Sequence, residues 1–256
     1  MSSEAIVAPG APRPFPPFRK WDRDFFLVWL LLIWVGIVMG FGSDMINHFQ
    51  SHEAPYPLIV HFHAVAFVGF LVLLTTQLLL IRRNRHDLHR KLGIAGFALA
   101  CVMLVLGPAT AIVVQRAAFG TPDSDPSFLS IQLIGILDFF VLIAAAALNR
   151  NNPSAHKRLI LLAILAISDA GFSRWLGGDI HAWFGGGHSF WISFAGLFMA
   201  TDFLALGIGA YDLITRGRLH PAYIAGTIWM FGCQATEVIL YHSPAWKTVA
   251  THLIGH

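Results

Sequence analysis

The sequence predicts an all-α, polytopic transmembrane bundle of about seven spans. Two observations lead to this prediction. First, 56% of the 256 residues are hydrophobic and only 12% are Asp, Glu, Lys or Arg, whereas about a quarter of the residues of a soluble domain are charged. Second, the apolar residues gather in runs of roughly 20, the length that crosses the hydrocarbon core as a helix.

Short segments rich in polar and turn residues separate the apolar runs. We expect an irregular, basic, Pro-rich segment at 1–24, a transmembrane domain at 25–246 and a short tail at 247–256. The predicted spans are 25–46, 58–81, 92–114, 128–148, 159–176, 190–214 and 221–243. We interpret them as one helix followed by three helical hairpins.

The positions of the basic residues predict the orientation. If the N-terminus is cytoplasmic, 14 of the 17 Lys and Arg residues fall in cytoplasmic segments, and only Arg116, Arg174 and Lys247 do not. Cytoplasmic loops carry an excess of Lys and Arg in this way. The sequence therefore predicts a cytoplasmic N-terminus and a non-cytoplasmic C-terminus.

Three aspartates fall near the middle of predicted spans, namely Asp138, Asp169 and Asp202. An ionisable side chain in the hydrocarbon costs about 2.5–3.5 kcal/mol on insertion scales. Arg174 is the one basic residue predicted near them, so most of these carboxyl groups must be protonated, hydrogen-bonded or cation-bound. The four residues are a candidate proton or ion path, and the alternative is neutral, hydrogen-bonded helix packing.

Nine of the 13 histidines fall on the predicted non-cytoplasmic side. Imidazole with carboxylate suits Cu, Fe or Zn, and imidazole alone suits axial ligation of haem iron. The candidate metal ligands on this side are Asp44, His48, His61, His63 and Glu237, with His242 beside them. No compact signature such as HExxH is present, so the alternative is that these interfacial side chains are simply hydrated.

Three further histidines, His89, His156 and His220, stand at the starts of predicted helices beside Lys and Arg. Helix N-termini and basic residues favour anions. We therefore expect contact with lipid headgroups there, with a quinone headgroup or a haem propionate as the alternative ligand.

Several short strings occur together in the chain: HFHAVAF at 61–67, Gln77, LHRKLG at 88–93, AHKRLILLA at 155–163, RGRLHPA at 216–222 and PAW at 244–246. Together they resemble a family of uncharacterised bacterial seven-helix membrane proteins, over about 58 to 247. The resemblance implies a multi-pass protein of the bacterial cytoplasmic membrane and no particular activity. Its matched ionisable positions are His61, His63, His89, Asp138, His156, Asp202 and His220, whereas Asp44, His48, His181, His188 and Glu237 lie outside the pattern.

A histidine at one end of a helix and LHxxLG at the start of the next is also similar to b-type transmembrane cytochromes. In those proteins, histidines on neighbouring helices bind haem b near each membrane face. This resemblance implies the cofactor-binding pairs His61 or His63 with His242 on the outer side, and His89 with His156 or His220 on the inner side.

Three functions therefore stay open: a haem- or metal-containing redox protein, a proton- or cation-coupled transporter or channel, and a non-catalytic subunit or lipid-binding scaffold of a membrane complex. No phosphate-binding loop, dinucleotide fingerprint or nucleophile elbow is visible. The expected partners are the lipid bilayer, a quinone or other subunits, and no nucleic acid is expected.

Overall fold

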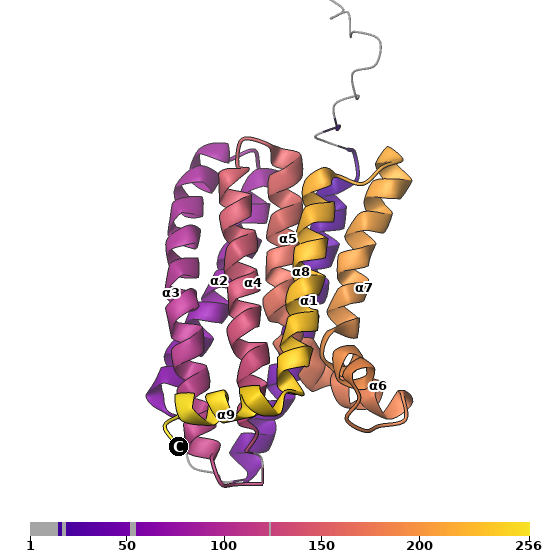
Figure 1. Cartoon of the computed structure of the whole chain (residues 1–256). Coiled ribbons are helices and arrows are strands. Elements are labelled where there is room, and N and C mark those ends of the chain that lie inside the picture. Colours follow the sequence, from indigo (N-terminus) through magenta and orange to yellow (C-terminus); the bar gives the residue numbers. More distant parts are fainter. Residues whose placement is uncertain (1–14, 17–18, 52–54, 123) are drawn as a thin grey trace, which may run out of the picture.

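A computed structural model describes residues 15–16, 19–51, 55–122 and 124–256. These described segments are mostly helical and contain no strand (Figure 1), which confirms the predicted all-α class. The predicted irregular segment 1–24 lies largely outside the described residues. Its last three residues, 22–24, already belong to the first helix, which begins at Asp22.

The elements follow one another in this order: α1 (Asp22–Ser51), α2 (Leu58–Arg82), α3 (His86–Ala118), the 3-10 turn η1 (Pro126–Phe128), α4 (Leu129–Leu148), α5 (Pro153–Phe172), the π-helical turn η2 (Ser173–Gly177), α6 (Gly178–Trp183), α7 (Phe190–Arg216), α8 (Pro221–Tyr241) and α9 (Pro244–Leu253). The long helices run alongside one another, and α9 lies across one end of the bundle (Figure 1).

Six helices in the described chain are long and apolar enough to cross a membrane: α1, α2, α3, α4 with the turn before it, the continuous stretch from α5 to α6, and α7. This is the composition of a multi-pass membrane protein. The seventh predicted span corresponds to α8, which is not among these six. Its sequence includes Gln234 and Glu237, whose polar side chains lower its mean hydropathy.

Two helices begin earlier than the apolar runs suggested, because polar residues also form helical turns. The fifth predicted span, 159–176, begins instead at Pro153. The side chain of Asn152 accepts a hydrogen bond from the Ala155 backbone N–H at 3.3 Å, and proline is favoured in the first helical turn. The third helix likewise begins at His86 rather than at 92.

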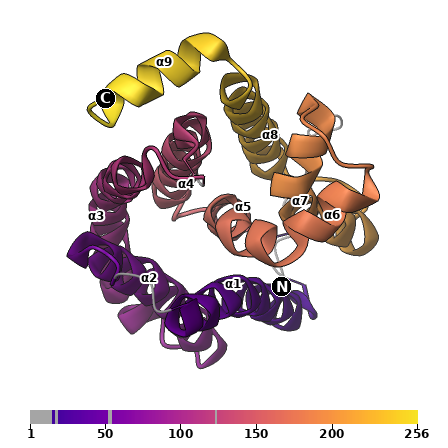
Figure 2. The same ribbon diagram turned by 90° about the horizontal axis from the view of Figure 1, so that it is seen from below.

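The helix α5 occupies the centre of the bundle and contacts α1, α4, α7 and α8 (Figure 2). Fourteen of its 20 residues are buried. We call the upper end of the bundle in Figure 1 the basic end, because the basic α2–α3, α4–α5 and α7–α8 connections lie there. The lower end, which carries α6 and α9, is called the α9 end.

The contact between α1 and α5 depends on glycine. A Cβ atom at Gly40 would overlap the carbonyl oxygen of Gly171, and one at Gly171 would lie 2.9 Å from the carbonyl oxygen of Gly36. Small residues at such contacts let two helix backbones approach closely. Gly42 has no such neighbour within 4 Å, so only part of the glycine-rich stretch of α1 forms the contact.

The C-terminal helix α9 is fixed to the end of the bundle by two hydrogen bonds to backbone carbonyls. The indole N–H of Trp246 donates to Ser127 O at 3.0 Å. The Nε–H of Arg116 donates to Ile254 O at 2.5 Å. Residues predicted as a short tail thus include a helix that lies across the bundle, as interfacial helices do.

Candidate functional site

Four carboxyl side chains from four helices are buried inside the bundle. They are Asp138 on α4, Asp169 on α5, Asp202 on α7 and Glu237 on α8, and none is more than 9% exposed. The carboxyl group of Asp169 lies within electrostatic range of the other three. We call these four residues the acidic cluster.

Two aspartates of the acidic cluster have a neutral hydrogen-bond donor. The Thr201 hydroxyl donates to Asp169, and the Gln234 amide donates to Asp202 Oδ1 at 3.0 Å. The Trp229 side chain lies near the Asp138 carboxyl group, whose Oδ1 is buried without a partner. The cluster is therefore only partly satisfied by the protein.

No Lys or Arg in the described part of the chain forms an ion pair with the acidic cluster. Arg174, predicted beside the mid-membrane aspartates, instead donates through Nε to Asp44 Oδ2 at 2.8 Å. That pair is half exposed at the α9 end. Four carboxylates cannot be ionised together in an apolar interior without compensating charge, so protons or cations must accompany them.

The candidate metal ligands of the α9 end are not gathered at one point. Asp44 pairs with Arg174, His48 stacks on Tyr56 with ring centroids 3.9 Å apart, and Glu237 belongs to the acidic cluster. Within the described residues, no group of three or more His, Cys, Asp or Glu side chains is placed to hold a metal ion.

The three histidines implied for haem at the α9 end also have separate surroundings. His61 is exposed on α2. His63 stacks on Phe67 with a centroid separation of 4.0 Å. The ring Nε2 of His242 lies 3.0 Å from the Ser193 hydroxyl. The outer pairing thus stays a prediction.

At the basic end, two of the three inner histidines come together. The rings of His89 and His156 are 6.3 Å apart between centroids and nearly perpendicular, at 88°. The Nδ1 atom of His156 lies 2.8 Å from the carbonyl oxygen of Ala146, and Nδ1 of His89 is buried without a partner. A backbone carbonyl on one ring nitrogen is the usual support of a metal-binding imidazole.

The third inner histidine, His220, has a structural role. Its Nδ1 accepts a hydrogen bond from the Ala222 backbone N–H at 3.0 Å and so caps α8, while its ring packs edge-on against Phe15 at 4.6 Å. Burial and the nearby Arg158 guanidinium lower the pKa of His220. A neutral imidazole can accept the capping hydrogen bond.

A network of buried charges at the basic end is absent from the sequence predictions. Arg158 on α5 donates two hydrogen bonds to Asp212 on α7, one of them from Nε at 2.6 Å. Arg216 donates to Asp22 on α1 at 2.7 and 2.8 Å, and Lys157 donates to Asp22 at 2.5 Å. We call these five residues the ionic network; it joins α1, α5 and α7.

In the sequence alone, these basic residues indicate only the orientation of the chain in the membrane. One signal could have revealed the network: Asp212 and Arg216 are four residues apart and share a helix face, as an ion pair would, and they lie 3.3 Å apart. The partner on α5 could not be deduced, because Arg158 is 54 residues from Asp212 along the chain.

Comparisons with protein-family models, with curated proteins and with solved structures found no match. The predicted resemblance to bacterial seven-helix membrane proteins is therefore neither supported nor opposed by them, and the function has to be argued from the site itself.

Proposed function

We propose that this protein moves protons or small cations across the membrane through the acidic cluster. The observation that carries the proposal is the burial of four carboxyl groups without a basic partner in the described chain. Intramembrane acids of this kind are costly and typical of ion pathways. If they served only to pack helices, one or two fully hydrogen-bonded groups would suffice.

In this proposal the carboxyl groups act as successive proton carriers. Each of the four can hold one proton when neutral, and protons would pass between them through bridging waters or side-chain rotation, because proton transfer requires hydrogen-bond contact or one intervening water. The unpartnered Oδ1 of Asp138 is an acceptor that could take up such a proton. Thr201 and Gln234 keep the Asp169 and Asp202 carboxyl groups oriented without supplying charge.

The proposed topology is seven spans with the basic end in the bacterial cytoplasm. The 21 residues of α8 give a helix of about 31 Å, enough to cross the hydrocarbon core, and α8 runs alongside α4 and α5 (Figure 1). The concentration of 14 of the 17 Lys and Arg residues on one side supports this orientation. On this topology, the acidic cluster lies between the two aqueous phases.

The proposal is tested in proteoliposomes that enclose a pH-sensitive dye. An imposed pH gradient or membrane potential should drive proton or cation flux through the wild-type protein. Asp138→Asn and Glu237→Gln should lower the flux to that of protein-free vesicles, because an amide cannot carry a proton in the same way. Asp44→Asn, which removes a half-exposed acid outside the cluster, is the matched control and should conduct like wild type.

Equal flux in all three variants, at equal protein incorporation, would contradict the proposal. So would an absence of flux through the wild type. That result would favour the third function named by the sequence, a non-catalytic subunit or lipid-binding scaffold of a membrane complex.

One observation favours a second function, a haem or transition-metal site at the basic end. Two imidazoles 6.3 Å apart between ring centroids are compatible with a metal between them, because each Fe–N or Cu–N bond is about 2 Å long, similar to Zn–N. His156 has the carbonyl support that such a ligand requires. When bound there, haem or copper would supply one-electron chemistry.

This second proposal is tested by visible spectra of purified protein, oxidised and then reduced with dithionite, together with metal analysis of the same sample. A Soret band or stoichiometric metal that disappears in His156→Ala and His89→Ala would support the site at the basic end. Loss in His63→Ala or His242→Ala instead would move it to the α9 end. His188→Ala, an exposed loop histidine, is the control.

A further inference from the structure

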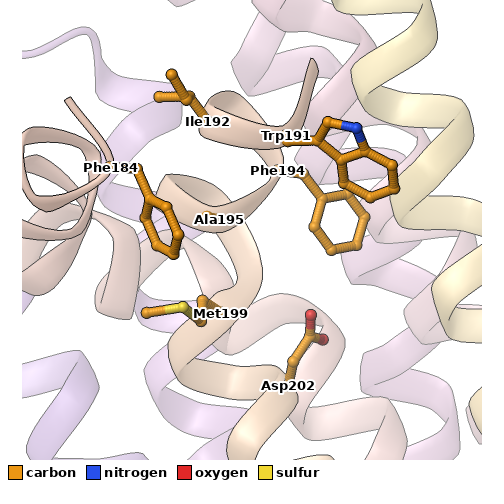
Figure 3. A pocket seen from close by; sticks show the side chains of 7 residues that line it. All are labelled: Phe184, Trp191, Ile192, Phe194, Ala195, Met199 and Asp202. Atoms are coloured by element: carbon orange, nitrogen blue, oxygen red, sulfur yellow. The ribbon is translucent and has the colours of Figure 1, made fainter. Parts of the chain in front are cut away.

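A cavity of about 290 Å³ lies beside α6 and α7 near the α9 end of the bundle (Figure 3). Its walls include the aromatic side chains of Phe184, Trp191 and Phe194 and the thioether of Met199. Asp202 is the one ionisable residue that lines it in the described chain. The cavity therefore combines apolar walls with a single acid, a composition common in small-molecule sites.

Only one of the two carboxyl oxygens of Asp202 accepts a hydrogen bond from the described chain. Asp202 is 8% exposed, and its Oδ1 accepts the hydrogen bond from Gln234. The described residues supply no hydrogen bond to Oδ2. Figure 3 shows the carboxyl group directed toward the space beneath the ring of Phe194. A ligand in the cavity would thus meet an acceptor that the protein leaves available.

The cavity opens where its lining is exposed. Trp191 is 75% exposed and Phe184 is 51% exposed, so they form the rim, whereas Ala195 is buried in the wall. Tryptophan at the end of a spanning helix is typical of the depth of the lipid headgroups. A ligand would therefore enter sideways, from the membrane interface, and not from the interior of the bundle.

We propose that this cavity binds a compact lipophilic amine, with its ammonium group on Asp202 and its apolar body between Phe184, Phe194 and Met199. A hydrocarbon chain alone would leave the buried acid unpaired, whereas an ammonium group donates to Oδ2 and is attracted to the faces of the aromatic rings. The volume lies near the lower end for ligand sites, about 300 Å³, which requires a compact ligand.

The site shares Asp202 with the proposed function but does not depend on it, because binding needs no transmembrane flux. The experiment is therefore equilibrium binding to the full-length protein in nanodiscs of neutral lipid, with empty nanodiscs as background. The probes are 1-adamantylamine, which is charged near neutral pH, and 1-adamantanol, which has a similar shape without the charge.

We expect saturable binding of the amine and at least tenfold weaker binding of the alcohol. Asp202→Asn should weaken amine binding by about thirtyfold or more, as loss of one partner of a buried charge pair does, and leave alcohol binding unchanged. Unchanged alcohol binding also shows that this variant is folded. Ala195→Leu should fill the cavity and weaken both ligands, whereas Asp179→Asn, an exposed acid on α6 outside the lining, should weaken neither.

Three outcomes would overturn the inference: no saturable binding of the amine, equal affinity for amine and alcohol, or full amine affinity in Asp202→Asn. Each of these leaves the flux experiment on Asp138 and Glu237 unaffected. Conversely, absent proton flux with selective amine binding would remove the proposed function and keep the amine site.

Discussion

Arg158 is the largest fully buried side chain in the described chain, and Asp212 compensates its charge. Asp212 also accepts a hydrogen bond from Arg216 at 3.3 Å, so one carboxylate accepts hydrogen bonds from two guanidinium groups. Removing one partner of a buried pair leaves an uncompensated charge, which costs far more than the intact pair contributes. The ionic network is therefore more important for specifying the helix arrangement than for net stability.

Asp212→Asn should accordingly destabilise the protein by about 3–5 kcal/mol. Thermal unfolding in detergent, followed by thiol-reactive fluorescence at the buried Cys233 in a background without the exposed Cys101, would measure the loss. Asp87→Asn is the matched control, because its pair with Arg85 is more than half exposed and such pairs contribute about 0–1 kcal/mol. Equal shifts of the two variants would contradict the role assigned to Asp212.

The sequence predicts part of the candidate site. The sequence singles out Asp138, Asp169 and Asp202 because acids inside apolar runs are rare, and all three are buried inside the bundle. It places Glu237 among the candidate metal ligands because this residue stands near the end of its span, whereas in the structure Glu237 is buried as well. Which acid faces which depends on helix rotation, and a single sequence without contacts between helices does not determine it.

At the scale of the elements, the α1–α5 contact is the most sensitive to side-chain size. Gly40→Ala should destabilise the bundle by about 1–3 kcal/mol or more, the usual cost of overpacking, because backbone and not a flexible side chain occupies the space. Gly42→Ala, on the same helix but in open space, should be neutral. Size-exclusion profiles and thermal unfolding would compare the stability of the two variants. A Gly40→Ala protein as stable as wild type would show that α1 and α5 can move apart without cost.

The approximate positions of the long helices were predictable from apolar run length, but the helix ends and the short helices α6 and α9 were not. The stretch from α5 through η2 to α6 continues for 31 residues, where the sequence suggested a short span at 159–176. Polar residues such as Ser173 and Arg174 end the apolar run but not the helix, which continues through η2 into α6. The helix α9 is not predictable from the apolar runs, because its ten residues have mixed polarity.

At the scale of the whole molecule, the proposed seven-span topology makes a labelling prediction. Single cysteines replace Arg218, His188 and His256 in a background without Cys101 and Cys233. A membrane-impermeant maleimide added to intact spheroplasts should label positions 188 and 256, and position 218 only after permeabilisation. Labelling of 218 and 256 from the same side would mean that α8 does not cross, leaving the six spans that are apolar enough by composition alone.

The central position of α5 has a consequence for biosynthesis. Its buried Arg158 and Asp169 pair with Asp212 and Thr201, which are made 54 and 32 residues later. At about 5–20 residues per second, Asp212 is made roughly 3–11 s after Arg158. During that interval α5 lies in the membrane or in the insertion machinery with an unpaired charge. Nascent chains arrested before α7 has left the ribosome should therefore be degraded faster than chains arrested after α7 has emerged, which pulse-chase of the two lengths would measure.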